Sequence, residues 1–101
     1  MPAYVVTEVE ILDAAEFARY AELAPPTIAA YGGRYLARGG QTALLDGAGG
    51  PAPKRLVILE FPTLERAREW EASPEYAPAK AIRQRAARVR MVAIAGLDPS
   101  P

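Results

Sequence analysis

Residues 24–40 read Ala-Pro-Pro-Thr-Ile-Ala-Ala-Tyr-Gly-Gly-Arg-Tyr-Leu-Ala-Arg-Gly-Gly and lead from a helix into a strand. The prolines at 25–26 disfavour a helical conformation in the residues before them, so we expect the helix to break there and to restart with Pro26 near its first turn. The glycines at 32–33 are expected to end it in a left-handed conformation. A second glycine pair at 39–40, inside the strand, indicates a bulge or a close approach to the backbone. Because arginines and tyrosines share this passage, it is also where we look for a site.

Hydrophobic periodicity on either side of this passage predicts alternating strands and helices. Asp13 and Glu16 form a variant of the capping box and start the first helix. Thr63 is expected to cap the second helix. Pro78 is expected to separate a short turn around Tyr76 from the last helix. The expected strands cover residues 4–11, 35–45, 54–61 and 89–95, the later helices cover 64–71 and 79–87, and a loop rich in glycine and proline covers 46–53.

The order of these elements is βαββαβ, with an extra helical piece before the last strand. It predicts an α+β, ferredoxin-like fold, in which an antiparallel four-stranded sheet carries two helices on one face. The nearly continuous apolar run at 55–61 is expected in a central strand. Strands with apolar residues on both sides leave the second face of the sheet uncovered. We therefore expect a homodimer that packs sheet against sheet.

Length and composition are typical of one compact domain. The chain has 101 residues, of which 50% are hydrophobic and 24% are charged, so we expect a single domain over residues 1–97 and a flexible tail over 98–101. Much of the apolar fraction is alanine, which contributes little buried area. A monomer would have a thin core, which also favours a dimer.

Absent residue types exclude several chemistries. The chain has no cysteine and no histidine, which rules out disulfides, thiolate catalysis, a serine triad, a conventional zinc site and histidine-ligated haem. We expect neither a metal nor a cofactor. The net charge of zero argues against nucleic acid as a partner. No apolar run approaches the ~20 residues that span a bilayer, and the N-terminus lacks a leader pattern, so we expect no membrane association and a cytoplasmic location.

Strand pairing brings an arginine and a glutamate together in the expected sheet. If the loop at 46–53 joins a hairpin, Leu45 lies near Lys54, and the glycine bulge places Arg38 close to Glu60. Glu60 shares its face of the strand with apolar residues, so its carboxylate is expected to be partly buried and paired. Arg38 is the expected partner, and Arg83 is the second candidate.

Two interpretations of this pair stay open. In the functional one, a pocket between sheet and helices binds a small carboxylate or enolate through Arg38 and Arg83, while Glu60 moves a proton. Tyr20 and Tyr31, on the inward face of the first helix, would line it. In the structural one, Arg38 and Glu60 form a buried ion pair without a ligand. Trp70 is expected to pack between helix and sheet, and as an alternative to wall the pocket.

The chain resembles the uncharacterised family known as domain of unknown function 1330, within the dimeric α/β barrel superfamily. The stretches that carry the resemblance cover nearly the whole domain: residues 4–6, 25–40, 54–62, Trp70, 73–76 and 82–83. The resemblance implies the ferredoxin-like fold and dimerisation, and it supplies no substrate. Superfamily relatives include cofactor-free monooxygenases, haem-degrading enzymes and lactone isomerases. Those that depend on histidine cannot be copied by a chain without histidine.

Three classes of function are consistent with these observations. The first is a module that binds a small anionic or enolic molecule. The second is a cofactor-independent oxygenase or isomerase with Glu60 as base and Arg38 as electrostatic stabiliser. The third is a structural dimer that binds no ligand.

Overall fold

The computed structural model describes residues 1–98. It confirms the expected order of elements, including the extra helical piece before the last strand. The elements are β1 (Ala3–Ile11), α1 (Ala14–Ala30), β2 (Arg34–Arg38), β3 (Arg55–Phe61), α2 (Leu64–Glu71), α3 (Ala77–Ala86) and β4 (Ala87–Ala95). Residues 99–101 of the expected C-terminal tail lie outside the described residues.

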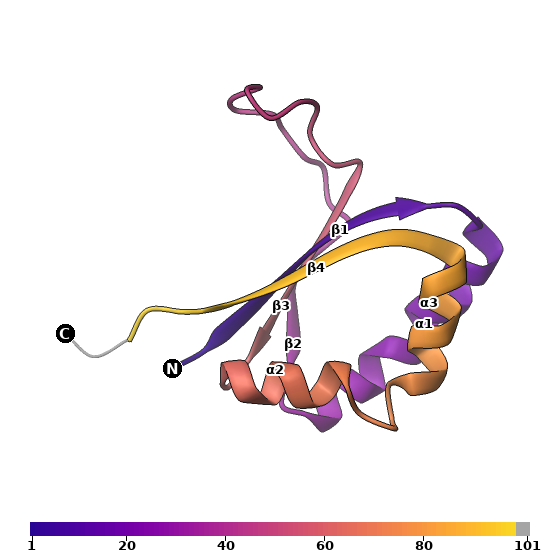
Figure 1. The fold of residues 1–101 in the computed structure, drawn as a ribbon, viewed down its shortest axis with the longest axis vertical. Coiled ribbons are helices and arrows are strands. Elements are labelled where there is room, and N and C mark those ends of the chain that lie inside the picture. The colour runs from indigo at the N-terminus through magenta and orange to yellow at the C-terminus, as the bar shows by residue number, and fades with distance from the viewer. Residues whose placement is uncertain (99–101) are drawn as a thin grey trace.

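The strands form one antiparallel sheet in the order β2-β3-β1-β4. All three helices lie on the same side of it, as Figure 1 shows, and the connection between β2 and β3 projects away from the body of the domain. This is the expected ferredoxin-like fold. The strand with the long apolar run, β3, is central as predicted, between β2 and β1.

Helix α1 runs through both prolines without a break, so the predicted interruption at Pro25 is wrong. The missing N–H of Pro25 would have bonded the carbonyl oxygen of Ala21, and Arg38 Nη2 donates to that oxygen instead, at 2.7 Å. A substitute donor thus offsets part of what a proline costs inside a helix. The predicted end of the helix is confirmed, because Gly32 has a φ of 77° and the following amide bonds Ile28 O.

Strand β2 is shorter than predicted and ends at Arg38. Its register against β3 shifts between Tyr35 and Ala37, so the bulge lies before the glycine pair and not at it. Gly39 instead meets the second expectation, a close approach to the backbone. It has a φ of 69°, and a Cβ at this position would overlap the guanidinium of Arg55. Only glycine suits this position.

The later helical region also differs slightly from expectation. Pro78 lies in the first turn of α3, which begins at Ala77, and does not precede the helix. Proline is compatible with that turn because the N–H groups there have no partner within the helix. Strand β4 follows α3 directly.

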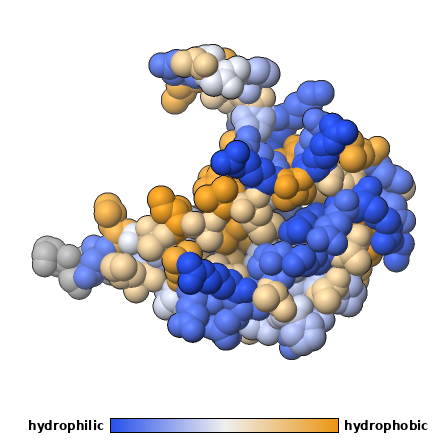
Figure 2. All heavy atoms as spheres, in the orientation of Figure 1, coloured by the Kyte–Doolittle hydropathy of each residue, from blue (hydrophilic) through white to orange (hydrophobic). Residues whose placement is uncertain are grey.

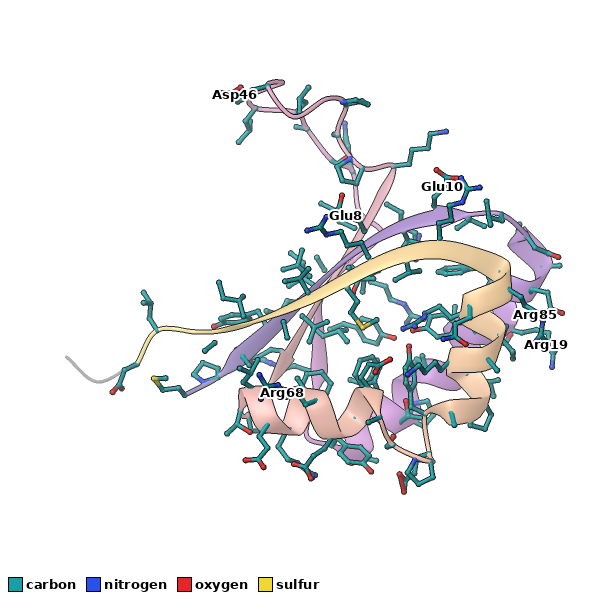
Figure 3. All side chains as sticks on the ribbon, in the orientation of Figure 1. Glu8, Glu10, Arg19, Asp46, Arg68 and Arg85 are labelled. Carbon is teal, nitrogen blue, oxygen red and sulfur yellow. The ribbon has the colours of Figure 1, made fainter. Side chains whose placement is uncertain are left out.

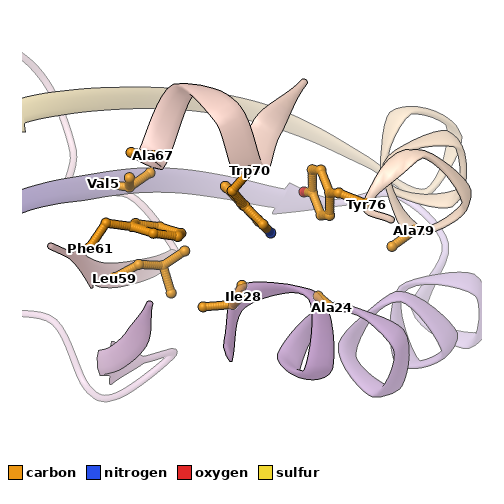
Figure 4. Packing of buried hydrophobic residues seen from close by; sticks show 9 residues of the cluster. All are labelled: Val5, Ala24, Ile28, Leu59, Phe61, Ala67, Trp70, Tyr76 and Ala79. Carbon is orange, nitrogen blue, oxygen red and sulfur yellow. The ribbon is translucent and has the colours of Figure 1, made fainter. Parts of the chain in front are cut away.

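Aromatic side chains form the centre of the core between the sheet and the helices (Figure 4). Trp70 stacks against Tyr76 with ring centroids 4.2 Å apart and against Phe61 at 5.4 Å. These are the largest fully buried side chains of the described residues. The indole N–H of Trp70 donates to Thr27 Oγ1 at 3.1 Å. The expected packing role of Trp70 is therefore confirmed.

On the opposite face of the sheet, the described residues place no helix. Cross-strand rows on this face run Ile94–Tyr4–Glu60–Arg34 and Val92–Val6–Ile58–Ala37. Figure 3 shows Glu8 and Glu10 extending from β1 on the side away from the helices. In the space-filling view, hydrophobic colours gather along the strands while the helices are mostly hydrophilic outside (Figure 2). Val92 and Ile94 remain 48% and 59% exposed.

Candidate functional site

A small cavity of about 40 Å³ lies between the sheet and the helices. Every helix and every strand contributes to its wall. Its lining is mostly apolar, apart from Thr7, two tyrosines (Tyr20 and Tyr35) and three arginines (Arg38, Arg55 and Arg83). The space holds a few water molecules or a group of a few heavy atoms.

The register of the strands explains how arginines come to face the helices. On the helix side, one cross-strand row runs Met91–Thr7–Val57–Arg38, and the next runs Val89–Val9–Arg55. Side chains alternate between the two faces of a strand, so Arg55 points the same way as Val57 and Leu59. The bulge at Leu36 gives Arg38 the same orientation. Both cations therefore face the cavity, with Arg38 at its exposed rim.

Each of the three guanidinium groups is held by a different set of contacts. Arg38 lies over the ring of Tyr35, 4.5 Å from its centroid, and bonds the carbonyl of Ala21. Arg55 lies 5.5 Å from the centroid of the Phe17 ring. Arg83 Nη1 donates to Tyr76 Oη at 3.1 Å, and the Arg83 side chain is only 11% exposed. Aromatic faces are favourable but weak partners for a cation.

Negative charge to balance these cations is scarce. Of the residues that the structure describes, no acidic one lines the cavity. Glu71 Oε2 lies 3.9 Å from Arg83, but the same oxygen is 2.7 Å from Lys80 Nζ, its closer partner. Among residues 1–98, the buried Nε of Arg55 has no hydrogen-bond partner. A buried charged donor without an acceptor is unfavourable, so the cavity favours an anion.

A chain of hydrogen bonds connects Arg83 to the cavity through two tyrosines. Tyr76 Oη accepts from Arg83 and lies 2.6 Å from Tyr20 Oη. Tyr76 is fully buried. The arrangement that satisfies its proton has Tyr76 donating to Tyr20, which leaves the Tyr20 proton for an acceptor in the cavity. Burial raises the pKa of Tyr20 and of Tyr76, so both hydroxyls remain protonated donors at neutral pH.

The structure brings four of the predicted site residues together and separates two. Tyr20, Arg38, Trp70 and Arg83 line the cavity. Tyr31 does not: its hydroxyl donates to Glu75 at 2.7 Å, and Arg66 covers its ring. This hydrogen bond lowers the pKa of Glu75. Tyr31 is therefore part of a surface contact and not of the cavity wall.

The predicted pairing of Arg38 with Glu60 is wrong. Arg38 lies opposite Val57 on β3, while Glu60 lies opposite Arg34, whose Nε bonds its carboxylate at 2.7 Å. The predicted register assumed strands continuous to Leu45, but β2 ends at Arg38 and has its bulge at Leu36. Glu60 also lies on the open face of the sheet, opposite to the cavity. Arg83, the second predicted partner, bonds Tyr76.

The sequence interpretation missed three residues of this site: Arg55, Tyr35 and Tyr76. The alternation Arg55, Val57, Leu59, Phe61 was visible in the sequence and places Arg55 on the helix side. Tyr35 gave no such signal, since the bulge that follows it changes which residues share a face. Tyr76 was expected only within a short turn.

Metal and membrane candidates were also sought in the part of the chain that the structure describes. Over residues 1–98, no group of three acidic side chains is arranged to hold a metal ion. Over the same residues, no helix has the length and apolar character needed to cross a bilayer.

The fold and the cavity define a ferredoxin-like α+β protein with a cationic, aromatic-lined pocket. The sequence model described as "Domain of unknown function (DUF1330)" matches residues 2–97. The chain therefore belongs to this family. No curated protein matches the chain in sequence.

Solved structures support the same fold. A protein of unknown function from Rhodopseudomonas palustris is 23% identical over 97% of this chain and 84% of that chain, with a TM-score of 0.76. SnoaB, a cofactor-independent oxygenase from Streptomyces nogalater, is 14% identical over 99% and 97% of the two chains, with a TM-score of 0.64. A dimeric ferredoxin-like protein of unknown function from Jannaschia sp. CCS1 is 12% identical over 95% and 100%, with a TM-score of 0.60. At these identities the likeness is one of fold.

Proposed function

We propose that the protein binds a small organic anion, a carboxylate or an enolate, in the cavity between sheet and helices. The observation that carries this proposal is the meeting of Arg38, Arg55 and Arg83 at one cavity that has no acidic residue in its lining within the described part of the chain. The orphaned Nε of Arg55 supplies a donor that is already desolvated. Charge-assisted hydrogen bonds from guanidinium groups to a carboxylate are among the stronger polar contacts in proteins.

The tyrosines add specificity to this charge. When Tyr76 is the donor in its 2.6 Å contact with Tyr20, the proton of Tyr20 is free for a ligand oxygen. The aromatic rings of Phe17 and Tyr35 restrict the approach to the guanidinium groups. The rest of the cavity wall is apolar. It disfavours hydrated inorganic ions, which pair with this wall less well than an organic carboxylate does.

Isothermal titration of the protein with sodium butanoate tests the proposal. We expect saturable binding with one site per chain in a background of sodium chloride. Butylamine, which has the same chain and the opposite charge, is the matched control and should give no heat of binding. Equal binding of both compounds, or of neither, would contradict the proposal and favour a structural protein without a ligand.

A second candidate function is that of a cofactor-independent oxygenase or isomerase. The Tyr20–Tyr76–Arg83 chain supports it, because its donors suit the developing oxyanion of an enolisable substrate. The predicted base, Glu60, lies on the opposite face of the sheet, so the substrate would have to lose its proton to a water molecule, while the arginines stabilise the anion that forms. Anaerobic and aerobic incubation with a quinol distinguishes the two candidates: turnover in wild type that Tyr20→Phe abolishes would support an enzyme.

The open face of the sheet supports a homodimer. The row Val92–Val6–Ile58–Ala37 is apolar throughout, and Val92 and its neighbour Ile94 are half exposed in a single copy. A second copy has the same apolar residues and covers them by packing sheet on sheet. A cytoplasmic location and the lack of a nucleic-acid partner stay predictions from the sequence.

A further inference from the structure

A second hollow, of about 320 Å³, lies between α2 and the edge strand β4. Small apolar side chains from both elements line it, notably Ala67 on α2 and Ala93 on β4, together with Val5 of β1. Figure 3 shows Arg68 on the side of α2 that is nearer to the sheet. Arg68, Glu71 and Arg83 are the charged residues of its lining, and the other lining residues are mainly apolar.

This groove and the arginine-lined cavity share a wall. Trp70, Arg83, Val89 and Met91 line both hollows. Arg83 Nη1 lies 3.9 Å from Met91 Sδ, so these two side chains stand next to each other in the shared wall. Methionine is unbranched and adapts its conformation easily, which makes Met91 the movable part of this wall. Arg83 is thus accessible from both hollows. It lies between the small arginine-lined cavity and the larger, mainly apolar groove.

We infer that the ligand is an amphipathic carboxylate, with its anionic head at the arginines and an alkyl chain or ring in the groove between α2 and β4. This inference rests on the proposed anion-binding function. The cavity alone holds little more than a carboxylate, whereas the groove has eight times its volume, about 320 Å³ against 40 Å³. Arg83 lines both spaces, so one ligand can reach it with the head and occupy the groove with the chain.

The alkyl chain of such a ligand contributes to affinity because its apolar surface is buried in the groove. Each methylene group of the ligand that moves from water into the groove lowers Kd about fourfold, as the transfer free energy of a CH₂ group implies. The groove therefore predicts a steep dependence on chain length up to the length that fills it. Beyond that length, further methylenes reach solvent and add nothing.

Titration with a series of straight-chain carboxylates, from acetate to decanoate, tests this inference by calorimetry. We expect Kd to fall about fourfold per methylene and then to level off. Ala93→Phe fills the groove and should flatten the series while leaving the affinity for acetate unchanged. Ala95→Phe is the matched control, since Ala95 shares the face and strand of Ala93 but does not line the groove. It should leave the series steep.

The outcomes separate the two proposals. Measurable acetate binding with no dependence on chain length in wild type would overturn the inference and leave the anion-binding function intact. A steep series that Ala93→Phe does not flatten, or that Ala95→Phe flattens equally, would show that the alkyl chain of the ligand binds outside this groove. Either result would also overturn the inference. No binding of any member of the series would contradict the anion-binding function itself.

Discussion

Arg38 donates a hydrogen bond to the carbonyl oxygen of Ala21 over 2.7 Å, at the place where Pro25 leaves that oxygen without its helical partner. Two unusual features of the sequence, a proline pair and an arginine at a strand end, are therefore parts of one contact. It keeps α1 continuous past the prolines. It also fixes the guanidinium at the rim of the cavity, over the ring of Tyr35.

This contact predicts that Arg38 and Pro25 are energetically coupled. Arg38→Met should lower stability by about 1 kcal/mol, the contribution of a typical hydrogen bond. In a Pro25→Ala background, the restored N–H at position 25 satisfies Ala21, so the same change should cost measurably less. Urea denaturation of the four proteins gives the coupling. An equal loss in both backgrounds would show that Arg38 does not replace the missing N–H.

Tyr20→Phe removes the hydroxyl that lies 2.6 Å from Tyr76. We expect a loss of about 1–3 kcal/mol in the free energy of unfolding, because Tyr76 keeps a buried donor without an acceptor. Tyr31→Phe is the control, since the Tyr31 hydroxyl bonds Glu75 at the surface and should matter less. Equal losses in the free energy of unfolding would indicate that the buried Tyr20–Tyr76 pair stabilises the fold no more than the surface hydrogen bond of Tyr31.

The same tyrosines predict a dependence on alkaline pH. The pKa of Tyr20 and of Tyr76 is raised in the folded protein, chiefly by burial, so the folded state holds these protons more tightly than the unfolded chain. Their contribution to stability is full below pH about 10, where unfolded tyrosine ionises, and is lost as pH rises from there toward the folded-state pKa. Tyr20→Phe should flatten the decline of the unfolding midpoint above this pH. An unchanged slope would contradict the assignment.

Glu60 is expected to play no part in ligand binding. Glu60→Gln should leave the affinity for butanoate within twofold of wild type, because the carboxylate lies on the face opposite to the cavity. Its ion pair with Arg34 is partly exposed, with Arg34 at 69%, so the change should alter stability by less than about 1 kcal/mol. Calorimetric titration and urea denaturation check both statements. A large loss of affinity would restore Glu60 as a site residue.

The open face of the sheet predicts a mutation that separates the dimer. Val92→Asp places a charge in the apolar rows and should shift the protein from dimer to monomer in sedimentation-equilibrium measurements. Leu45→Asp, at an exposed leucine in the loop between β2 and β3, is the control and should leave assembly unchanged. A wild-type protein that is monomeric at all concentrations would contradict the dimer.

Local chemistry allowed most of the fold to be predicted from the sequence. The two N-cap residues were predicted correctly, since both Asp13 and Thr63 accept from the third residue after them. The reciprocal half of the capping box was wrong, because the amide of Asp13 donates to Ala86 O and not to Glu16. The register between β2 and β3 was not predictable in the same way. A bulge at Leu36 exchanges the faces of the following residues, and nothing in the apolar residues around it announces that shift.

Only part of the candidate site was predicted correctly, because the register between β2 and β3 also decides which residues meet in it. Arg38 and Arg83 were chosen for their charge and their place in the chain, and both line the cavity. The partner assigned to Arg38 depended on the register and was therefore wrong. Arg55 was overlooked because an arginine at the start of an apolar strand is usually interpreted as a solvent-exposed strand end. Its alternation with Val57 nevertheless placed it on the helix side.

The central claim is that the buried Nε of Arg55, a half-buried residue that lines the cavity, is a donor for an anion. Calorimetric titration of Arg55→Met with butanoate tests it most directly, with Arg34→Met as the matched control, an arginine on the open face of the same sheet. We predict that Arg55→Met loses at least tenfold in affinity while its unliganded form is no less stable than wild type, since the uncompensated buried donor is gone. Arg34→Met should bind as wild type does. Unchanged affinity in Arg55→Met, or an equal loss in both variants, would contradict the account.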